Sequence, residues 1–223
     1  SKNSTAAGPT GSTMLHLKHL GAFGIRYLTH LFNLLVQNAD IPLIWKSALI
    51  VPILKPGKPA DRAGSYRPIS LLCPEVKVLE RRNLVPLRAS LPPALSLHGF
   101  RSQHSTVSAL LPLANRVADG FNERKPASRT GPLCVDLSKA FDVVTHHKLV
   151  ERICRSDLHS NLKRWLVAYL RDRKVRCIHQ GKASKWRKLK MGVAQGSVIS
   201  PLLFNFYSRS ISPADDSFAP DNH

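Results

Sequence analysis

The chain has 223 residues, of which 43% are hydrophobic, and its 33 Lys and Arg against 14 Asp and Glu give a formal net charge of +19. This length suits a domain with a real core, and no apolar run approaches the roughly 18 residues of a membrane span. The four scattered cysteines argue against a zinc ribbon or a C-x-x-C redox pair. The large positive charge predicts a polyanionic partner such as nucleic acid.

The first half of the chain alternates between helical and extended patterns. Residues 1–13 are polar, rich in Ser, Thr and Gly, and predict a flexible segment. They lack the apolar stretch of a secretory signal, so we expect an intracellular protein. Apolar residues at helical spacing predict a helix over 25–35, and 47–59 reads as a strand that runs into a Pro/Gly loop. Further along we expect an extended segment over 65–72 and helices over 75–91 and 105–125.

The second half opens with a short apolar run, 133–136, which predicts a strand with Cys134 in the core and Asp136 at its end. The elements expected after it are helices over 145–153 and 158–170, a basic hairpin over 174–193 and a helix from about Ser200. This mixed order without regular alternation predicts an α+β fold and not a doubly wound sheet.

The positive charge is concentrated between residues 163 and 190, where eleven Lys and Arg accompany one acid, Asp172. Aromatic residues are interleaved with these cations, as expected where bases stack and phosphates are gripped. The alternative is a solvated basic face with the aromatic residues in the core. The aromatic residues are Trp165, Tyr169 and Trp186.

A carboxylate at the end of a buried strand, as predicted for Asp136, has two readings. It caps the following turn, or it binds a metal ion. Paired carboxylates occur later, at Asp215 and Asp216. Two divalent ions that clamp the attacking and leaving oxygens of a phosphoryl transfer need carboxylates from separate strands. The alternative is that this pair of carboxylates lies on the solvated surface and has no role in metal binding.

Two further patterns are typical of phosphate or nucleotide binding. Lys55 and Arg67 fall on neighbouring extended segments, where Arg can grip a triphosphate bidentately and Lys as a point charge. Glycines flank Gln195, and glycine permits close approach of a backbone to a ligand. The alternative for the second pattern is a plain helix entry.

Six strings occur in one order over residues 14–207: LIWKSALIVPILKPGKP, SYRPISLL with VKVLERR, HGFRSQHST, VDLSKAFDVV, LKRWLVAYLRDRKV and GVAQGSVISPLLFNFY. Together they resemble the reverse transcriptase of non-LTR (LINE-type, jockey-like) retrotransposons. The resemblance implies a right-hand polymerase that copies RNA into DNA, with an antiparallel palm sheet covered by helices on one face. Residues 14–132 would be fingers-like with part of the palm, and 133–223 palm-like, truncated near the catalytic hairpin and without a thumb. The resemblance also implies a location in the nucleus or in a cytoplasmic ribonucleoprotein particle.

The resemblance also implies roles for individual residues. Asp136, Asp215 and Asp216 would be catalytic and, with the carbonyl of Leu137, would hold two Mg²⁺ ions, or Mn²⁺ in their place. Phe141 would be the steric gate, occupying the space of a ribose 2′-hydroxyl. The residues expected to contact the incoming dNTP are Lys55, Arg67, Phe141, Gln195 and Gly196. Those expected to contact the RNA template and the DNA primer or target DNA are Arg101, His104, Lys163, Arg164, Arg171, Arg173, Lys174, Lys185, Arg187 and Lys188.

The C-terminal end departs from the family pattern. Pro213 precedes the pair Asp215 and Asp216, and only six residues separate Tyr207 from Ala214. Proline cannot donate the N–H that a hairpin strand needs. The pair is therefore either a displaced remnant or a coincidence, and the alternative function is a catalytically decayed, nucleic-acid-binding remnant of the polymerase.

Overall fold

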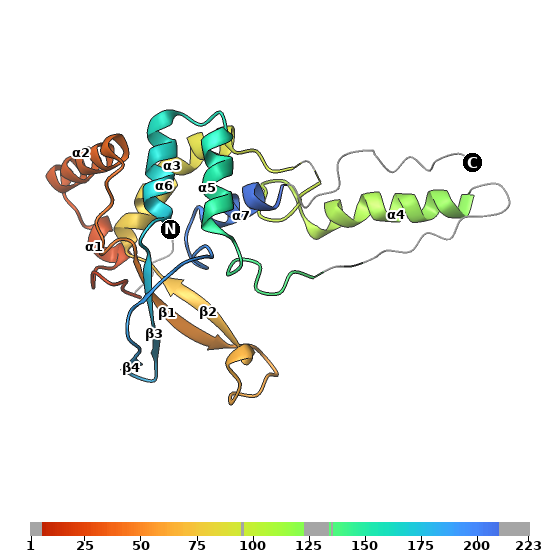
Figure 1. Ribbon diagram of the computed structural model, residues 1–223, viewed down its shortest axis with the longest axis horizontal. Helices are drawn as coiled ribbons and strands as arrows, with labels where there is room; N and C mark the ends of the chain where they lie inside the picture. The colour runs from red at the N-terminus through yellow and green to blue at the C-terminus, as the bar shows by residue number, and fades with distance from the viewer. Residues whose placement is uncertain (1–5, 95, 123–133, 135, 210–223) are drawn as a thin grey trace.

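A computed structural model describes residues 6–94, 96–122, 134 and 136–209, and Figure 1 shows a group of helices beside one end of a twisted sheet. In chain order the elements are α1 (Met14–Lys18), α2 (Ala22–Asn38), β1 (Ser47–Leu54), a 3-10 turn (Ala63–Ser65), β2 (Tyr66–Leu71), α3 (Pro74–Ser90), α4 (Thr106–Asn122), α5 (His146–Arg155), α6 (Ser160–Leu170), β3 (Lys174–His179), β4 (Lys182–Ala183), β5 (Arg187–Lys188) and α7 (Ser200–Ser208).

The sheet is mixed, with strand order β2-β1-β3-β4 and with β5 paired to β3. β1 and β2 form an antiparallel hairpin in which Leu49 faces Leu71. β3 runs parallel to β1, with Ala48 beside Val175. The described sheet is therefore mixed, and the antiparallel palm sheet stays a prediction. The α+β class holds.

The core lies among the helices. Trp165 and Leu166 of α6 are fully buried in one apolar cluster with Leu79 of α3, Ile153 of α5 and Leu203 of α7. These positions recur at helical spacing within their elements, which is why each helix buries one stripe. The cluster also contains Val193 and Ile199, which lie on either side of the loop that precedes α7. The core therefore fixes the loop on which the candidate site depends.

Most predicted elements are present, with ends shifted by a few residues, but the described residues of 133–136 do not form the predicted strand. Its two described residues, Cys134 and Asp136, lie outside any strand and are exposed. An apolar run becomes a strand only where a sheet edge accepts it. On β2, the N–H of Ser70 is already bonded to the carbonyl of Gln195. The prediction that Cys134 is buried is wrong.

The described part of the N-terminal segment, residues 6–13, contacts α3 and the residues just before it. The Ser12 hydroxyl donates to Glu75 Oε1 at 2.7 Å. Gly8 lies so close to the backbone of Leu72 and Cys73 that a Cβ there would meet it at 2.6 Å. This segment covers the start of α3.

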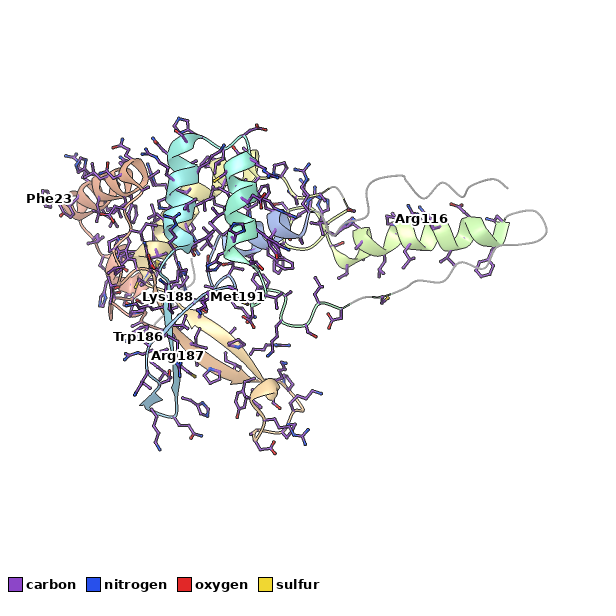
Figure 2. The ribbon with its side chains drawn as sticks, in the orientation of Figure 1. Phe23, Arg116, Trp186, Arg187, Lys188 and Met191 are labelled. Carbon is purple, nitrogen blue, oxygen red and sulfur yellow. The ribbon has the colours of Figure 1, made fainter. Side chains whose placement is uncertain are left out.

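Two helices carry exposed apolar side chains. α4 projects away from the rest of the described chain (Figure 1), and Ser105 caps it by accepting from the Ser108 N–H at 3.2 Å. Phe23 projects from α2 (Figure 2) and is 85% exposed. Among the described residues, no helix combines the length and apolar character needed to cross a membrane.

Candidate nucleotide-binding site

Two cationic side chains lie at the end of the β1–β2 hairpin where the loop joins the two strands. The backbone N–H of Lys55 donates to the Ser65 carbonyl at 2.8 Å, and its Nζ donates to the Gly64 carbonyl at 3.0 Å. Arg67 lies in β2 opposite Ile53 and is exposed. The hairpin therefore brings Lys55 and Arg67 together, as their places in the sequence predict.

The outer edge of β2 holds the loop that carries Gln195. Because the Lys55 N–H bonds to Ser65, antiparallel alternation leaves Ser70 in a non-hydrogen-bonded pair, with its N–H and C=O directed away from β1. That N–H donates to the Gln195 carbonyl at 2.8 Å. Pro68 occupies the same kind of position but has no N–H to donate. Ser70 is therefore the anchor for the loop on this edge.

Gly196 lies against the same point of β2. Its φ of +133° is a conformation that side-chain-bearing residues rarely adopt, and a Cβ at this position would stand 2.5 Å from the Ser70 carbonyl oxygen. The close approach that the glycine permits is thus to the chain's own backbone. Gly196 shapes the loop beside Gln195.

A tight turn carries Phe141. The Asp142 N–H closes the turn by donating to the Lys139 carbonyl at 2.8 Å, and the Phe141 carbonyl accepts from the Val193 N–H at 2.8 Å. The Phe141 ring stacks on Phe204 of α7, with the ring centroids 5.1 Å apart. Backbone bonds and ring stacking thus fix this turn against the Gln195 loop.

These three segments line a cavity of about 470 Å³, which we call the hairpin cavity. Its lining also includes Lys139 and Asp142, to which the sequence pattern assigned no role. Three cations therefore accompany one carboxylate, a balance that suits a ligand with several negative charges. Four of the five residues predicted to bind nucleotide line it: Lys55, Arg67, Phe141 and Gln195.

The predicted metal ligands are not assembled in the described residues. Asp136 and Leu137 are exposed and do not line the hairpin cavity. Asp215 and Asp216 lie outside the residues that the structure describes. Within residues 6–94, 96–122, 134 and 136–209, no three His, Cys, Asp or Glu side chains come close enough to hold a metal ion. Because metal sites need several converging ligands, the described residues alone do not fit a two-metal centre.

A buried polar network under the Gln195 loop escaped the sequence analysis. Glu80 of α3 is fully buried, and its Oε1 accepts from the Tyr169 hydroxyl at 2.6 Å. Its Oε2 accepts from the Val198 N–H at 2.6 Å. Burial raises the pKa of the Glu80 carboxyl and that of the Tyr169 hydroxyl. A signal existed in the sequence: Glu80 lies four residues after the buried Val76, on the apolar stripe of α3.

Comparison with known proteins decides the family. The model of the family described as reverse transcriptase (RNA-dependent DNA polymerase) matches residues 53–214, which include the whole hairpin cavity except Ile50 and Pro52. The chain belongs to the reverse transcriptase family.

Individual relatives agree. The chain is 32% identical over 204 residues to the probable RNA-directed DNA polymerase from transposon BS of Drosophila melanogaster, covering 87% of this chain and 22% of that protein. It is 34% identical over 207 residues to the corresponding X-element protein of the same species, covering 90% and 22%. The RNA-directed DNA polymerase from mobile element jockey of Drosophila funebris is 31% identical over 186 residues, covering 82% and 20%. The resemblance to a jockey-like retrotransposon reverse transcriptase is confirmed, and the chain spans about a fifth of the length of these relatives.

Exposed cations of the chain gather on and around β3 to β5. Figure 2 shows Trp186, Arg187 and Lys188 close together beside β3, and the Arg176 guanidinium lies over the Trp186 ring at 4.8 Å. Lys188 Nζ pairs with Asp172 at 2.6 Å, and this hydrogen bond lowers the pKa of the Asp172 carboxyl. Exposed cations predicted to contact nucleic acid are Arg171, Lys174, Lys185, Arg187 and Lys188.

Three residues of the basic segment lie in the interior, which corrects their predicted roles. Trp165 and Tyr169 are 0% and 3% exposed, so the alternative of core aromatic residues is right for both. Arg173 is 3% exposed, with its guanidinium 4.5 Å from the centre of the Tyr169 ring and a hydrogen bond to the Tyr169 carbonyl. A charge count along the chain does not tell which side of an element faces water.

Two other cations of the predicted surface bind the ends of helices. Lys163 Nζ donates to the Cys154 carbonyl at 2.9 Å, in the last turn of α5. Arg164 donates to the Gln37 carbonyl at 3.2 Å, in the last turn of α2. Both bonds satisfy carbonyls that a helix end leaves without a partner.

The segment HGFRSQHST lines a separate cavity of about 520 Å³ with the start of α7. Arg101 donates to the Leu97 carbonyl at 2.8 Å, and His104 Nδ1 is 2.9 Å from the Ser102 carbonyl. The His104 ring lies 5.2 Å from that of His98. Arg101 and His104, predicted to contact the template, thus also shape their own loop.

Proposed function

We propose that the hairpin cavity binds the incoming dNTP of an RNA-directed DNA polymerase. The observation that carries this proposal is the meeting of Lys55, Arg67, Phe141 and Gln195, from three distant parts of the sequence, at one cavity. Arg67 would hold a phosphate bidentately, and Lys55, directed by its bond to the Gly64 carbonyl, would act as a point charge. Gln195 would offer a neutral donor and acceptor to the sugar or base.

Phe141 is the proposed gate against ribonucleotides. A gate must resist displacement, because rejection of a 2′-hydroxyl depends on a fixed wall. Phe204 supports the ring from one side, and Phe100 meets it edge-on at 5.8 Å. Truncation of Phe141 to Ala should therefore admit ribonucleotides. Unchanged selection between dATP and ATP would contradict the assignment.

We further propose that the β1–β2 hairpin belongs to the fingers-like region, 14–132. The Phe141 turn, the basic strands β3 to β5 and α7 would belong to the palm-like region, 133–223. The exposed cations of β3 to β5 would hold the phosphate backbone of the template and primer. Trp186 offers an exposed ring for base stacking.

Transfer itself is proposed to need two Mg²⁺ ions, or Mn²⁺, held by Asp136, Asp215, Asp216 and the Leu137 carbonyl. Because the described residues alone do not form such a centre, this assignment depends on the C-terminal carboxylates. When bound, the ions would stabilise the attacking and leaving oxygens of nucleotidyl transfer.

Primer extension on an RNA template with dNTPs and Mg²⁺ tests this function. We expect Asp136→Asn to abolish extension and Arg67→Ala to raise the KM for dATP about tenfold or more, since hydrogen bonds between charged groups are the strong ones. Lys58, in the loop between β1 and β2, is an exposed cation that does not line the hairpin cavity; Lys58→Ala is therefore the control and should leave the KM unchanged.

Two outcomes would contradict parts of the proposal. An Asp136→Asn variant that still extends primers would remove Asp136 from the metal site. Salt-sensitive nucleic-acid binding without any extension by the wild-type chain would instead favour the decayed, nucleic-acid-binding remnant.

A further inference from the structure

A buried carboxylate joins two helices to the loop that carries Gln195. Glu80 lies on α3, its partner Tyr169 on α6, and its second partner, the Val198 N–H, just before α7. Both oxygens of the side chain are therefore used, and the residue is 0% exposed. An acid buried in this way is costly unless its hydrogen-bonding groups are satisfied.

The surroundings of Glu80 reduce that cost. The Arg173 guanidinium lies against the Tyr169 ring, and its positive charge favours the ionised form of Glu80. The Tyr169 hydroxyl also lies 3.2 Å from the Ser197 Oγ. Glu80, Tyr169, Ser197 and Arg173 thus form one polar group in an otherwise apolar core.

The network reaches Gln195 through a short, well-bonded turn. The Ser197 N–H donates to the Ala194 carbonyl at 3.1 Å. The Ser197 Oγ accepts from the N–H groups of Ile199 and Ser200, each at 3.2 Å, at the start of α7. Ser70 holds the same loop on its other side through the Gln195 carbonyl. The loop is therefore fixed at two points, β2 and Glu80.

We propose that Glu80 is a positioning residue for the hairpin cavity: by holding the Val198 N–H it sets where the Gln195 side chain stands relative to the bound nucleotide. The effect on the nucleotide rests on the proposed function, whereas the effect on the loop does not. The two parts need separate measurements.

Hydrogen–deuterium exchange tests the loop. Glu80→Leu keeps the volume but leaves the Val198 N–H without an acceptor, so we expect that amide to exchange about tenfold faster. Glu80→Gln can accept from Val198 with its oxygen and donate to Tyr169 with its nitrogen, so it should restore most of the protection. Glu151 lies on the exposed side of α5, so Glu151→Leu is the matched control. It should change neither the exchange rate of the Val198 amide nor the affinity for dATP.

Affinity for radiolabelled dATP, measured by equilibrium dialysis on the full 223-residue chain, tests the cavity. We expect Glu80→Leu to weaken binding about tenfold and Glu80→Gln by less than about threefold. In a Gln195→Ala background Glu80→Leu should have less than about a twofold further effect, because the side chain it positions has gone. In an Arg67→Ala background, by contrast, the loss of dATP affinity caused by Glu80→Leu should be the same as in the wild type.

The outcomes separate the two claims. Normal exchange at Val198 in Glu80→Leu, or an equal loss of dATP affinity with and without Gln195, would overturn the positioning role. Should Glu80→Leu not fold, Tyr169→Phe removes the other hydrogen bond and enters the same cycle with a smaller expected loss. Absence of dATP binding by the wild-type chain would overturn the nucleotide part, while exchange at Val198 would still decide the loop.

Discussion

The Gln195 loop and the basic strands β3 to β5 lie close together in the chain but are stabilised in different ways. The loop is fixed by backbone hydrogen bonds to β2 and by the buried Glu80, so its position depends on packing and on satisfied polar groups. The basic strands have short pairings and exposed cations, so their importance lies in charge. Substitutions in the loop should therefore change stability and site geometry, and those in the strands should change salt dependence.

The largest effect is expected from Gly196→Ala. The new Cβ would clash with the Ser70 carbonyl in a backbone conformation that alanine avoids, so we expect the free energy of unfolding to fall by about 3 kcal/mol. Gly181→Ala is the matched control, because Gly181 also has a positive φ but a methyl group there would meet no heavy atom within 4 Å. Its cost should be about 1 kcal/mol. Equal losses in urea denaturation would mean that the close approach to β2 is unimportant.

A smaller effect, and one on binding only, is expected in the basic strands. Lys185→Ala together with Arg187→Ala should reduce the slope of log affinity for RNA against log salt concentration by about 2, one for each phosphate that the two cations neutralise. Stability should hardly change, since both side chains are exposed. A salt titration of binding measures this, and an unchanged slope would exclude these strands from the interface.

The contributions of Glu80 and Asp172 to stability should change with pH in opposite directions. Burial raises the pKa of Glu80 above its ordinary 4.5, so the folded state keeps a proton that the unfolded state releases, and stability falls as pH rises through this window. Glu80→Gln cannot titrate, so the stability of the wild-type chain relative to this variant should decrease as the pH rises above 4.5, the ordinary pKa of the carboxyl. Urea denaturation at a series of pH values measures the difference. A constant difference would contradict the burial of a titrating carboxyl.

The smallest effect is expected at Asp172, which is exposed. The hydrogen bond from Lys188 lowers its pKa below the ordinary 3.8, so the stability that it contributes is present above that pH and is lost as pH falls further. Lys188→Gln should return the pKa toward the ordinary value, as followed by an NMR titration of the carboxyl. An unchanged titration would mean that the pair does not persist in water, as is common for exposed pairs.

The same contrast explains how much the sequence reveals. Helices followed from apolar spacing, and the meeting of Lys55 with Arg67 followed from two strands joined by a loop. The mixed sheet did not, because local pattern says nothing about which distant strand pairs with β1. Nor did the inward orientation of Arg173, because its neighbours in sequence are exposed cations.

The site was likewise predicted only in part. Short motifs predicted four of the residues that line the hairpin cavity, because each of these motifs lies within one short segment of the chain and can be recognised locally. Glu80 was missed because its hydrogen bonds join α3 to segments far along the chain, and a charged residue within a polar string suggests a solvated face. The exposure of Cys134 was missed because strand formation depends on a free sheet edge.

The most direct test of the central claim is the affinity of the full chain for radiolabelled dATP, measured by equilibrium dialysis for the wild type, Arg67→Ala and Lys58→Ala. We predict that Arg67→Ala weakens binding about tenfold or more, because the guanidinium would supply two hydrogen bonds between charged groups. Lys58→Ala should bind as the wild type does. If the two variants bind dATP equally well, the hairpin cavity is not the nucleotide site.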